Sequence, residues 1–361
     1  PAVSNERWLI SSRYPRRPKG RLFMTRATAN NEIVAKAIRL ACRAPSLHNS
    51  QPWRWIVGEG VVDLFVDHGR ILRSADRSGR EALISCGAAL SHFRIAMAAA
   101  GWKANVDTFP STAERDHLTS VDFSPAEYVT AVERDRAEAI RKRRTDRLPF
   151  YAPSHWTVIE PALRNAADHV MVSLDVLPDD ARPALAVAAG LTESVRRCDE
   201  YYHDEMRWWT EAFRGYQGVP PSALVSDGER ERVGFNRTFP ATQYGDRRPD
   251  IRTDEAKVLV LSTPECTRAD ALNCGEALSD VLIECTIAGL ATCTLSHITE
   301  LPKSRAVIQE LIDNRAVPQL LVRVGNAPVV EDIPAPTPRL PLSEVMQMKV
   351  HESRSARCPQ P

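Results

Sequence analysis

The sequence predicts an α+β protein with two similar halves in one chain, and three observations carry this prediction. Residues 86–91 read CGAALS and residues 274–279 read CGEALS, an offset of 188 residues. An Ala-Gly pair, at 100–101 and at 288–289, repeats at the same offset. Each repeated stretch has the apolar periodicity of a helix and precedes a strand-like segment. A period this long is not that of a solenoid and indicates a duplicated domain, with coincidence between two Ala-rich helices as the alternative.

The other elements are predicted in chain order. In the first half we expect a helix over 31–43, a hairpin from 54–57 and 61–67 with its turn at 58–60, a helix that ends at Gly101, and a strand over 104–109. A charged helix over 126–143 separates the halves. In the second half we expect strands over 170–177, 257–262, 292–298 and 319–324, and a helix that ends at Gly289. Glycine at both helix ends suits a left-handed cap.

These elements divide the chain into a first half at 24–130 and a second half at 131–345. We expect 1–23 to be a disordered extension, because it is rich in Arg and Pro and lacks the apolar run of a signal peptide. We expect 346–361 to be a frayed tail. No segment reaches the ~18 consecutive apolar residues of a membrane span, so no contact with a membrane is expected.

The composition is that of an ordinary globular protein and excludes several function classes. The 361 residues are 43% hydrophobic and 26% charged, with 47 basic and 46 acidic side chains. A net charge of +1 gives no general attraction to nucleic acid or to an anionic membrane. The eight cysteines form no CxxC pair and no zinc-like cluster with the nine histidines. We therefore expect reduced thiols in a cytoplasmic protein without a metal site.

The run APSLHNSQPW at 44–53 is the most specific motif. It closes the first predicted helix and opens the first strand, and its prolines restrict the backbone. The short polar side chains of Ser46, Asn49 and Ser50 can present hydroxyl and amide groups to a planar polar heterocycle. A plain helix exit is the alternative.

The second motif is RRTDRLPF at 143–150, at the end of the charged helix. Guanidinium groups beside a hydroxyl suit a single dianionic phosphate, because Arg donates paired hydrogen bonds to phosphate oxygens. The basic residues of 141–147 are also typical of a nucleic-acid patch or of a solvated helix end. Both alternatives stay open, although the balanced charge of the chain disfavours the first.

Three further segments contain candidate residues. The loop after the second repeated helix reads ATCTLSH at 291–297, and its single histidine is either structural or part of a site. Near the end, a strand that ends in Gly325 precedes the Pro-rich run PAPTPRLP at 334–341. Aromatic residues gather at 201–216, where they form either ordinary core or part of a lid over about 200–250.

Together these motifs resemble those of the nitroreductase family, over roughly 30–345. Members carry a Pro-Ser-x-x-Asn-x-Gln-Pro-Trp run, an Arg-x-Ser/Thr-x-Lys/Arg motif, a loop beside the flavin and a late Pro-rich segment with an Arg. The resemblance implies the nitroreductase fold, with two halves forming a pseudo-dimer around a mixed or antiparallel sheet flanked by helices. It implies FMN as the cofactor and NAD(P)H as the electron donor. The motifs match the fused, dormancy-associated Acg type of mycobacteria and related actinobacteria.

The resemblance also implies roles for single residues. The turn contacts the flavin and its ribityl chain, the arginine motif holds the phosphate and the N1–C2=O edge, the loop passes the ring near N5, and the last arginine binds phosphate. The residues of the turn are Pro45, Ser46 and Asn49, and those of the arginine motif are Arg143, Arg144, Thr145 and Arg147. The residues of the loop are Leu295, Ser296 and His297, and the last arginine is Arg339. Two positions depart from the family pattern, since His297 stands where a glycine is usual and Thr337 where a lysine is usual.

The order of the motifs bears on function, because the turn lies in the first half and the other motifs lie in the second. The resemblance therefore implies one composite site, in an oxidoreductase that passes hydride from NAD(P)H through FMN to a nitroaromatic or quinone-type acceptor. Since the cofactor carries the chemistry, no catalytic side chain is assigned. The alternative is an FMN-sequestering or storage protein whose lid closes over the flavin. Such a pseudo-dimer is expected to be a monomer or to form a homodimer.

Overall fold

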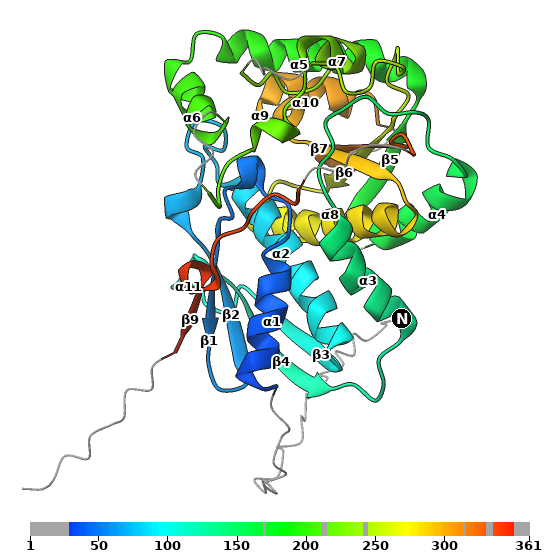
Figure 1. Cartoon of the computed structure of the whole chain (residues 1–361). Coiled ribbons are helices and arrows are strands. Elements are labelled where there is room, and N and C mark those ends of the chain that lie inside the picture. The colour runs from blue at the N-terminus through cyan, green and yellow to red at the C-terminus, as the bar shows by residue number, and fades with distance from the viewer. Residues whose placement is uncertain are drawn as a thin grey trace, which may run out of the picture.

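Two long helices, α2 (Arg80–Ala99) and α8 (Arg268–Ile287), lie between two sheets at the centre of the molecule (Figure 1). The computed structural model describes residues 29–168, 171–210, 215–240, 245–312, 315–329 and 335–349. The expected extension at 1–23 and the part of the expected tail beyond residue 349 lie outside the described residues.

Sheet A has five strands in the order β3-β4-β2-β1-β9, and sheet B has four in the order β5-β6-β8-β7. All neighbours pair antiparallel except β1 and β9, which are parallel. The strands are β1 (Trp53–Val57), β2 (Val61–Val66), β3 (Trp102–Thr108), β4 (His117–Pro125), β5 (Ser173–Leu177), β6 (Lys257–Thr263), β7 (Ala291–Leu295), β8 (Val317–Gly325) and β9 (Met346–Met348). The predicted α+β class with mixed and antiparallel pairing is therefore confirmed.

The other helices surround this frame. They are α1 (Asn31–Ala41), α3 (Ala131–Lys142), α4 (Trp156–Ala167), α5 (Arg182–Arg196), α6 (Glu200–Thr210), α7 (Asp227–Val233), α9 (His297–Glu300), α10 (Pro302–Gln309) and α11 (Leu342–Val345). Helices α1 and α3 contact α2, whereas α10 contacts sheet B and packs against α5. Figure 1 shows α1, α2 and α3 beside sheet A, with α5, α7 and α10 at the opposite end of the molecule.

The central helices touch through their backbones. A Cβ atom added at Gly87 of α2 would lie 2.0 Å from the carbonyl oxygen of Leu272, and one added at Gly275 of α8 would lie 2.0 Å from that of Ile84. Glycine is therefore required at both crossing positions. The helices are buried on almost all sides over most of their length, as expected for the centre of a large core. The two repeated sequence stretches are thus the two halves of one contact.

Both central helices end as the sequence predicts. Gly101 and Gly289 adopt left-handed φ values of +83° and +74° directly after the helix caps. Each helix then leads into a strand, β3 after α2 and β7 after α8. The order of helix, glycine and strand is therefore the same at both places in the chain.

Two sequence expectations need correction. The strand expected over 292–298 ends at Leu295, because Thr299 donates its backbone N–H to Ser296 O at 2.9 Å and closes a helical turn. The first residues of the expected tail are part of the sheet, because Met346–Met348 forms β9 and pairs with β1. The last described segment of the chain therefore completes sheet A, to which the first half contributes the other four strands.

Among the described residues, one helix is long and apolar enough to cross a membrane by length and composition alone. This helix is α2, and 83% of its apolar window is buried inside the protein. A buried core helix passes the same test, so the finding is weak evidence for a membrane span.

The helix contact gives a stability prediction. We expect Gly87→Ala to lower the free energy of unfolding by about 3 kcal/mol or more, because the backbones of α2 and α8 must move apart. Chemical denaturation measures this change. Gly190→Ala in α5 is the matched control: an added Cβ there meets no atom within 4 Å, and alanine raises helix stability by about 0.5–1 kcal/mol. Equal stability of Gly87→Ala and the wild type would contradict the described crossing.

Candidate functional site

The turn at 44–53 connects α1 to β1 through an unusual backbone. His48, Asn49 and Gln51 have positive φ values of 49°, 59° and 54°. The Ser46 hydroxyl oxygen accepts a hydrogen bond from Gln51 N at 3.1 Å and stabilises the bend. Positive φ is unfavourable for residues other than glycine, and here three such residues lie within four positions of the chain. The turn therefore stores backbone strain of the kind found at functional sites.

Two distant segments pack against this turn. Asn49 Nδ2 donates to the carbonyl oxygens of Pro338 at 3.2 Å and Tyr216 at 3.4 Å. Gln51 Nε2 donates to the same Tyr216 oxygen at 2.8 Å, and Gln51 Oε1 accepts from Leu340 N at 2.9 Å. The turn therefore fixes both the Pro-rich segment and a segment of the predicted lid region next to the first half.

Arginine side chains gather at the carboxyl end of α1. Arg339 donates from Nε to Cys42 O at 2.9 Å and from Nη2 to Arg43 O at 3.2 Å, and Arg143 Nη2 donates to Arg43 O at 3.1 Å. The C-terminal carbonyls of a helix carry partial negative charge and stabilise cations. Among the described residues, no carboxylate lies within 4.0 Å of Arg43, Arg143 or Arg339.

Burial and mutual repulsion act on these guanidinium groups. Burial, with a contribution from Arg43, lowers the pKa of Arg143 to about 10. Burial, with contributions from Arg143 and Arg43, lowers the pKa of Arg339 to about 9. The three arginines remain charged at neutral pH, and an anion beside them would relieve both effects.

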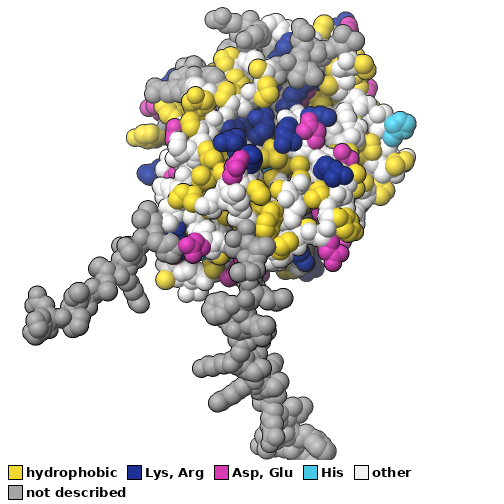
Figure 2. All heavy atoms as spheres, turned by 60° about the horizontal axis from the view of Figure 1, so that its bottom comes forward, with side chains coloured by type: hydrophobic (Ala, Val, Ile, Leu, Met, Phe, Trp, Pro, Cys, Tyr) yellow, Lys and Arg dark blue, Asp and Glu magenta, His cyan; other side chains and the backbone are white. Residues whose placement is uncertain are grey.

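A cavity of about 360 Å³ adjoins this arginine cluster. Its walls include Arg43, Arg143, Arg144, Thr145, Arg247 and Arg339, together with Pro45, Ser46 and Asn49 of the turn. We call it the arginine cavity. Figure 2 shows Lys and Arg side chains gathered on one part of an otherwise mixed surface.

A second, less charged cavity continues from the first. Pro45, Ser46, Thr145 and Arg147 line both cavities, which therefore adjoin. The second cavity is bounded by Leu295 at the end of β7 and by Ser296 and His297 after it. Residues of the central helices complete its wall: Glu81, Ile84, Ser85 and Leu278. We call it the ring cavity. All eleven site residues predicted from the sequence line one or both cavities.

Two histidines in the ring cavity are neutral. Burial lowers the pKa of His48 and of His297 well below the usual range, and the charge of Arg237 lowers both further. His297 Nε2 and both ring nitrogens of His48 are buried without a hydrogen-bond partner among the described residues. Asn49 Oδ1 and Arg143 Nε are in the same situation. These polar atoms fit a polar ligand, because buried polar groups are normally paired.

The arginine motif is held at the two cavities by main-chain hydrogen bonds to sheet B. Thr145 forms an isolated parallel bridge with Thr292, and Asp146 N donates to Thr292 O at 2.8 Å. The Asp146 carboxylate pairs with buried Arg248 at 2.6 Å and accepts from Leu148 N at 3.0 Å. The segment 143–147 is therefore held beside the start of β7, which leads to the loop at 295–297.

A buried ion-pair network lies behind the site. Asp254 contacts the guanidinium groups of Arg323 and of Arg182, the latter at 3.1 Å, and accepts from Phe150 N at 2.9 Å. Arg323 also donates to Asn236 Oδ1 at 3.3 Å, and Asn236 Nδ2 donates to Arg147 O at 3.0 Å. Asp254 thus positions the residue whose amide supports Arg147.

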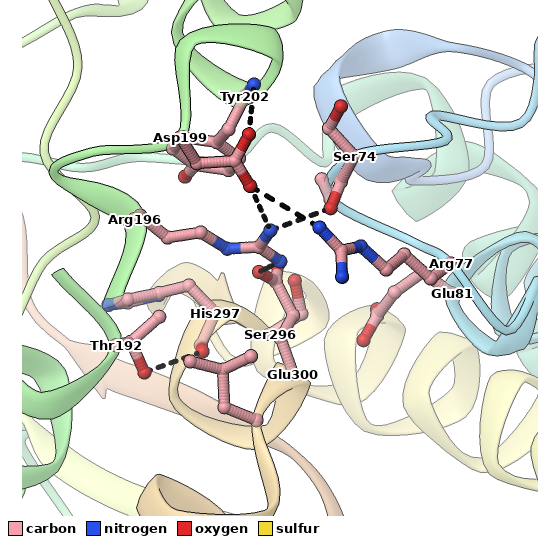
Figure 3. A network of polar contacts seen from close by, with 12 residues as sticks. Ser74, Arg77, Glu81, Thr192, Arg196, Asp199, Tyr202, Ser296, His297 and Glu300 are labelled. Carbon is pink, nitrogen blue, oxygen red and sulfur yellow. Dashed lines mark hydrogen bonds and ion pairs between the residues drawn. The ribbon is translucent and has the colours of Figure 1, made fainter. Parts of the chain in front are cut away.

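The predicted lid region is anchored by a second network (Figure 3). Arg196 of α5 donates to Ser74 O at 2.8 Å and pairs with Asp199 at 3.4 Å and with Glu300 at 3.5 Å. Arg77 pairs with the same Asp199 oxygen at 3.4 Å. This network joins α5 and the start of α6 to a loop of the first half, next to Ser296 and His297.

Several lining residues were missing from the sequence prediction. Arg43 and Arg247 line the arginine cavity, and Glu81, Arg237 and Phe239 line the ring cavity. Arg43 directly precedes the turn motif, so its position was a usable signal. The other four come from segments that carry no recognisable motif, and only the tertiary contacts bring them to the site.

Comparison with known proteins places the chain among mycobacterial relatives, although no family model matches it. It is 54% identical over 323 residues to a Mycobacterium tuberculosis H37Rv protein named "Putative NAD(P)H nitroreductase acg", covering 90% of this chain and 98% of the relative. It is 36% identical over 337 residues to a second protein of that organism with the same description, Rv3131, covering 91% and 95%. A solved nitroreductase with bound FMN from Desulfitobacterium hafniense aligns with a TM-score of 0.39 and 12% identity, covering 60% of this chain and 98% of that one.

The network behind the site gives a second stability prediction. We expect Asp254→Ala to lower the free energy of unfolding by about 3–5 kcal/mol, because Arg323 is fully buried and would lose its carboxylate partner. Urea denaturation measures the change. Asp179→Ala is the control, since Asp179 pairs with Lys257 on the surface and such pairs contribute about 0–1 kcal/mol. Similar losses in the two variants would show that the network does not stabilise the fold.

Proposed function

The chain belongs to the nitroreductase family, and from this premise we propose that it is an FMN-dependent oxidoreductase. It passes hydride from NADH or NADPH through the flavin to a nitroaromatic or quinone-type acceptor. FMN, when bound, supplies the two-electron chemistry, and the protein supplies binding, orientation and electrostatic stabilisation. We propose that the protein acts in the cytoplasm as a monomer or homodimer, with the two halves as a pseudo-dimer that holds one composite site.

One observation carries the proposal: three arginines without a nearby carboxylate, one of them buried and two half-buried, adjoin a cavity with unpaired polar atoms. A phosphate dianion would satisfy the guanidinium groups, and a polar heterocycle would satisfy the buried nitrogens and the Asn49 oxygen. FMN combines both groups in one molecule. The residues present therefore fit this cofactor.

The roles follow from the two cavities. We assign the phosphate to Arg143, Arg144, Thr145 and Arg339, with Arg43 as an additional ligand. We assign the ribityl chain and the ring to Pro45, Ser46 and Asn49 on one side and to Leu295, Ser296 and His297 on the other. We assign Arg147 to the N1–C2=O edge, where a fixed cation stabilises the negative charge that reduction produces.

A second candidate function is the sequestration or storage of FMN. The observation in its favour is the anchoring of the lid region, because Asn49 and Gln51 both donate to the Tyr216 carbonyl oxygen. In this candidate function the anchored lid prevents the donor and acceptor from reaching the ring.

An absorption measurement tests the proposal and separates the two candidates. We expect the purified protein to take up FMN, to be yellow, and to bleach on anaerobic addition of NADPH or NADH. A yellow protein that does not bleach would favour storage over turnover. A protein that stays colourless after incubation with FMN would overturn the proposal.

A substitution tests the phosphate assignment. We expect Arg143→Ala to weaken FMN binding by about 1.5–3 kcal/mol, roughly 10- to 150-fold, because a charge-assisted hydrogen bond to the phosphate is lost. Fluorescence titration with FMN measures the affinity. Arg134→Ala is the control, since Arg134 lies on α3, the helix that directly precedes Arg143, and is exposed outside both cavities. Unchanged affinity in Arg143→Ala would remove the phosphate assignment.

A further inference from the structure

A buried carboxyl group lies in the ring cavity without a place in any motif. Glu81 occupies the first turn of α2, is 5% exposed and lines the same cavity as Ser296 and His297. Figure 3 shows its side chain beside the network that contains Arg196 and Glu300. A carboxyl group at this depth needs a charge partner or a proton.

The groups around Glu81 come from several segments. Arg80 Nη2 donates to Glu81 Oε1 at 2.5 Å and is itself held by Thr299. Asp76 and Glu300 add negative charge, whereas Arg237 and Arg305 add positive charge. Glu300 is engaged by Arg237 and Arg196, and Asp76 Oδ2 accepts from Ala82 N at 2.9 Å.

The balance of these groups favours the protonated form of Glu81. Burial raises its pKa to about 7, Arg80 opposes this shift, and Asp76 and Glu300 reinforce it. Because the pKa in the folded protein is raised, the carboxyl group holds its proton below about pH 7 and loses it as the pH rises through 7. At pH 7 about half of the molecules therefore carry this proton, which the carboxyl group can release.

The other titratable side chains that line the ring cavity do not release a proton near pH 7. His48 and His297 are neutral, because burial lowers the pKa of each well below the usual range. Burial raises the pKa of the Cys293 thiol, and the remaining titratable groups are arginines. Among the described residues, Glu81 is the one carboxyl group that lines this cavity.

The proposed reaction requires a proton in addition to hydride. A quinone becomes a hydroquinone by gaining one hydride and one proton, and a nitro group becomes a nitroso group and water by gaining the same pair. Hydride brings both electrons, so the proton must come from water or from an acid in the cavity. A positioned acid accelerates such steps by about 10²–10⁴-fold.

We propose that Glu81 donates this proton to the electron acceptor, an inference that rests on the proposed function. The O–H bond of the carboxyl group breaks, and the proton joins an oxygen of the acceptor. Arg80 stabilises the carboxylate that remains, and water returns a proton before the next turnover.

The test separates the two half-reactions in the FMN-loaded protein. Stopped-flow spectroscopy follows flavin reduction by NADPH and then reoxidation by a soluble benzoquinone, between pH 5 and pH 9. In the wild type we expect reoxidation to slow as the pH rises through about 7. In Glu81→Gln we expect reoxidation at pH 6 to be about 100-fold slower and independent of pH, with unchanged flavin reduction. Glu81→Asp should restore part of the rate and of the pH dependence.

A readout without turnover accompanies the kinetics. Infrared spectroscopy of the FMN-free protein should show a protonated carboxyl band that titrates near pH 7 and is absent from Glu81→Gln. Glu205→Gln is the control: burial raises the pKa of Glu205 as well, but its carboxylate binds Ser74 N and Ala75 N outside both cavities. This control should keep the wild-type reoxidation profile.

The outcomes distinguish this inference from the proposed function. A protein that takes up FMN and bleaches with NADPH, but whose Glu81→Gln variant keeps the wild-type reoxidation profile, overturns the role of Glu81 alone. Equal slowing of both half-reactions in Glu81→Gln also overturns it, because that pattern indicates a structural role. A protein that takes up no FMN overturns the proposed function, and the inference falls with it.

Discussion

The backbone contact between α2 and α8 determines how close the two halves of the molecule lie. Gly87 and Gly275 each lack the side chain that would separate the helices, so the crossing occurs at the distance set by the main chains. Glu81, Ile84 and Ser85 of α2 and Leu278 of α8 line the ring cavity. The dimensions of that cavity therefore depend on the same contact. Ion pairs such as Arg94–Glu276, at 2.6 Å, add to the contact between the helices.

The electrostatic character of the site depends on where its charges find partners. Asp146 and Asp254 pair with arginines behind the cavities, and Glu300 pairs with Arg237 and Arg196 at the side. Arg143 and Arg339 instead donate to main-chain carbonyls at the end of α1. Carbonyl dipoles hold these side chains in place without cancelling their charge, so the cavity keeps a positive potential although the whole chain is nearly neutral.

The sequence predicted the parts of this arrangement that local patterns determine. The helix at 31–43, the first hairpin, the two repeated helices and their glycine caps left periodic or positional signals, and the eleven candidate site residues line the two cavities. Other features depend on long-range contacts. The loop at 296–299 turns into a helix because Ser296 O and Gln319 O accept from the Thr299 backbone and hydroxyl groups. The place of Glu81 in the ring cavity left no signal in the local sequence, because segments far apart in the chain form that cavity.

Strand β9 pairs with β1 although the two are separated by almost the whole described chain. During synthesis on the ribosome, the open edge of β1 has no native partner until residues 346–348 have emerged. Arg339 and the Pro-rich segment precede β9 with only the short helix α11 between them, so the anion-binding face is assembled at the same late moment. Premature termination anywhere before residue 339 thus yields a chain with an exposed sheet edge and an incomplete set of arginines, a product suited to degradation by quality-control proteases.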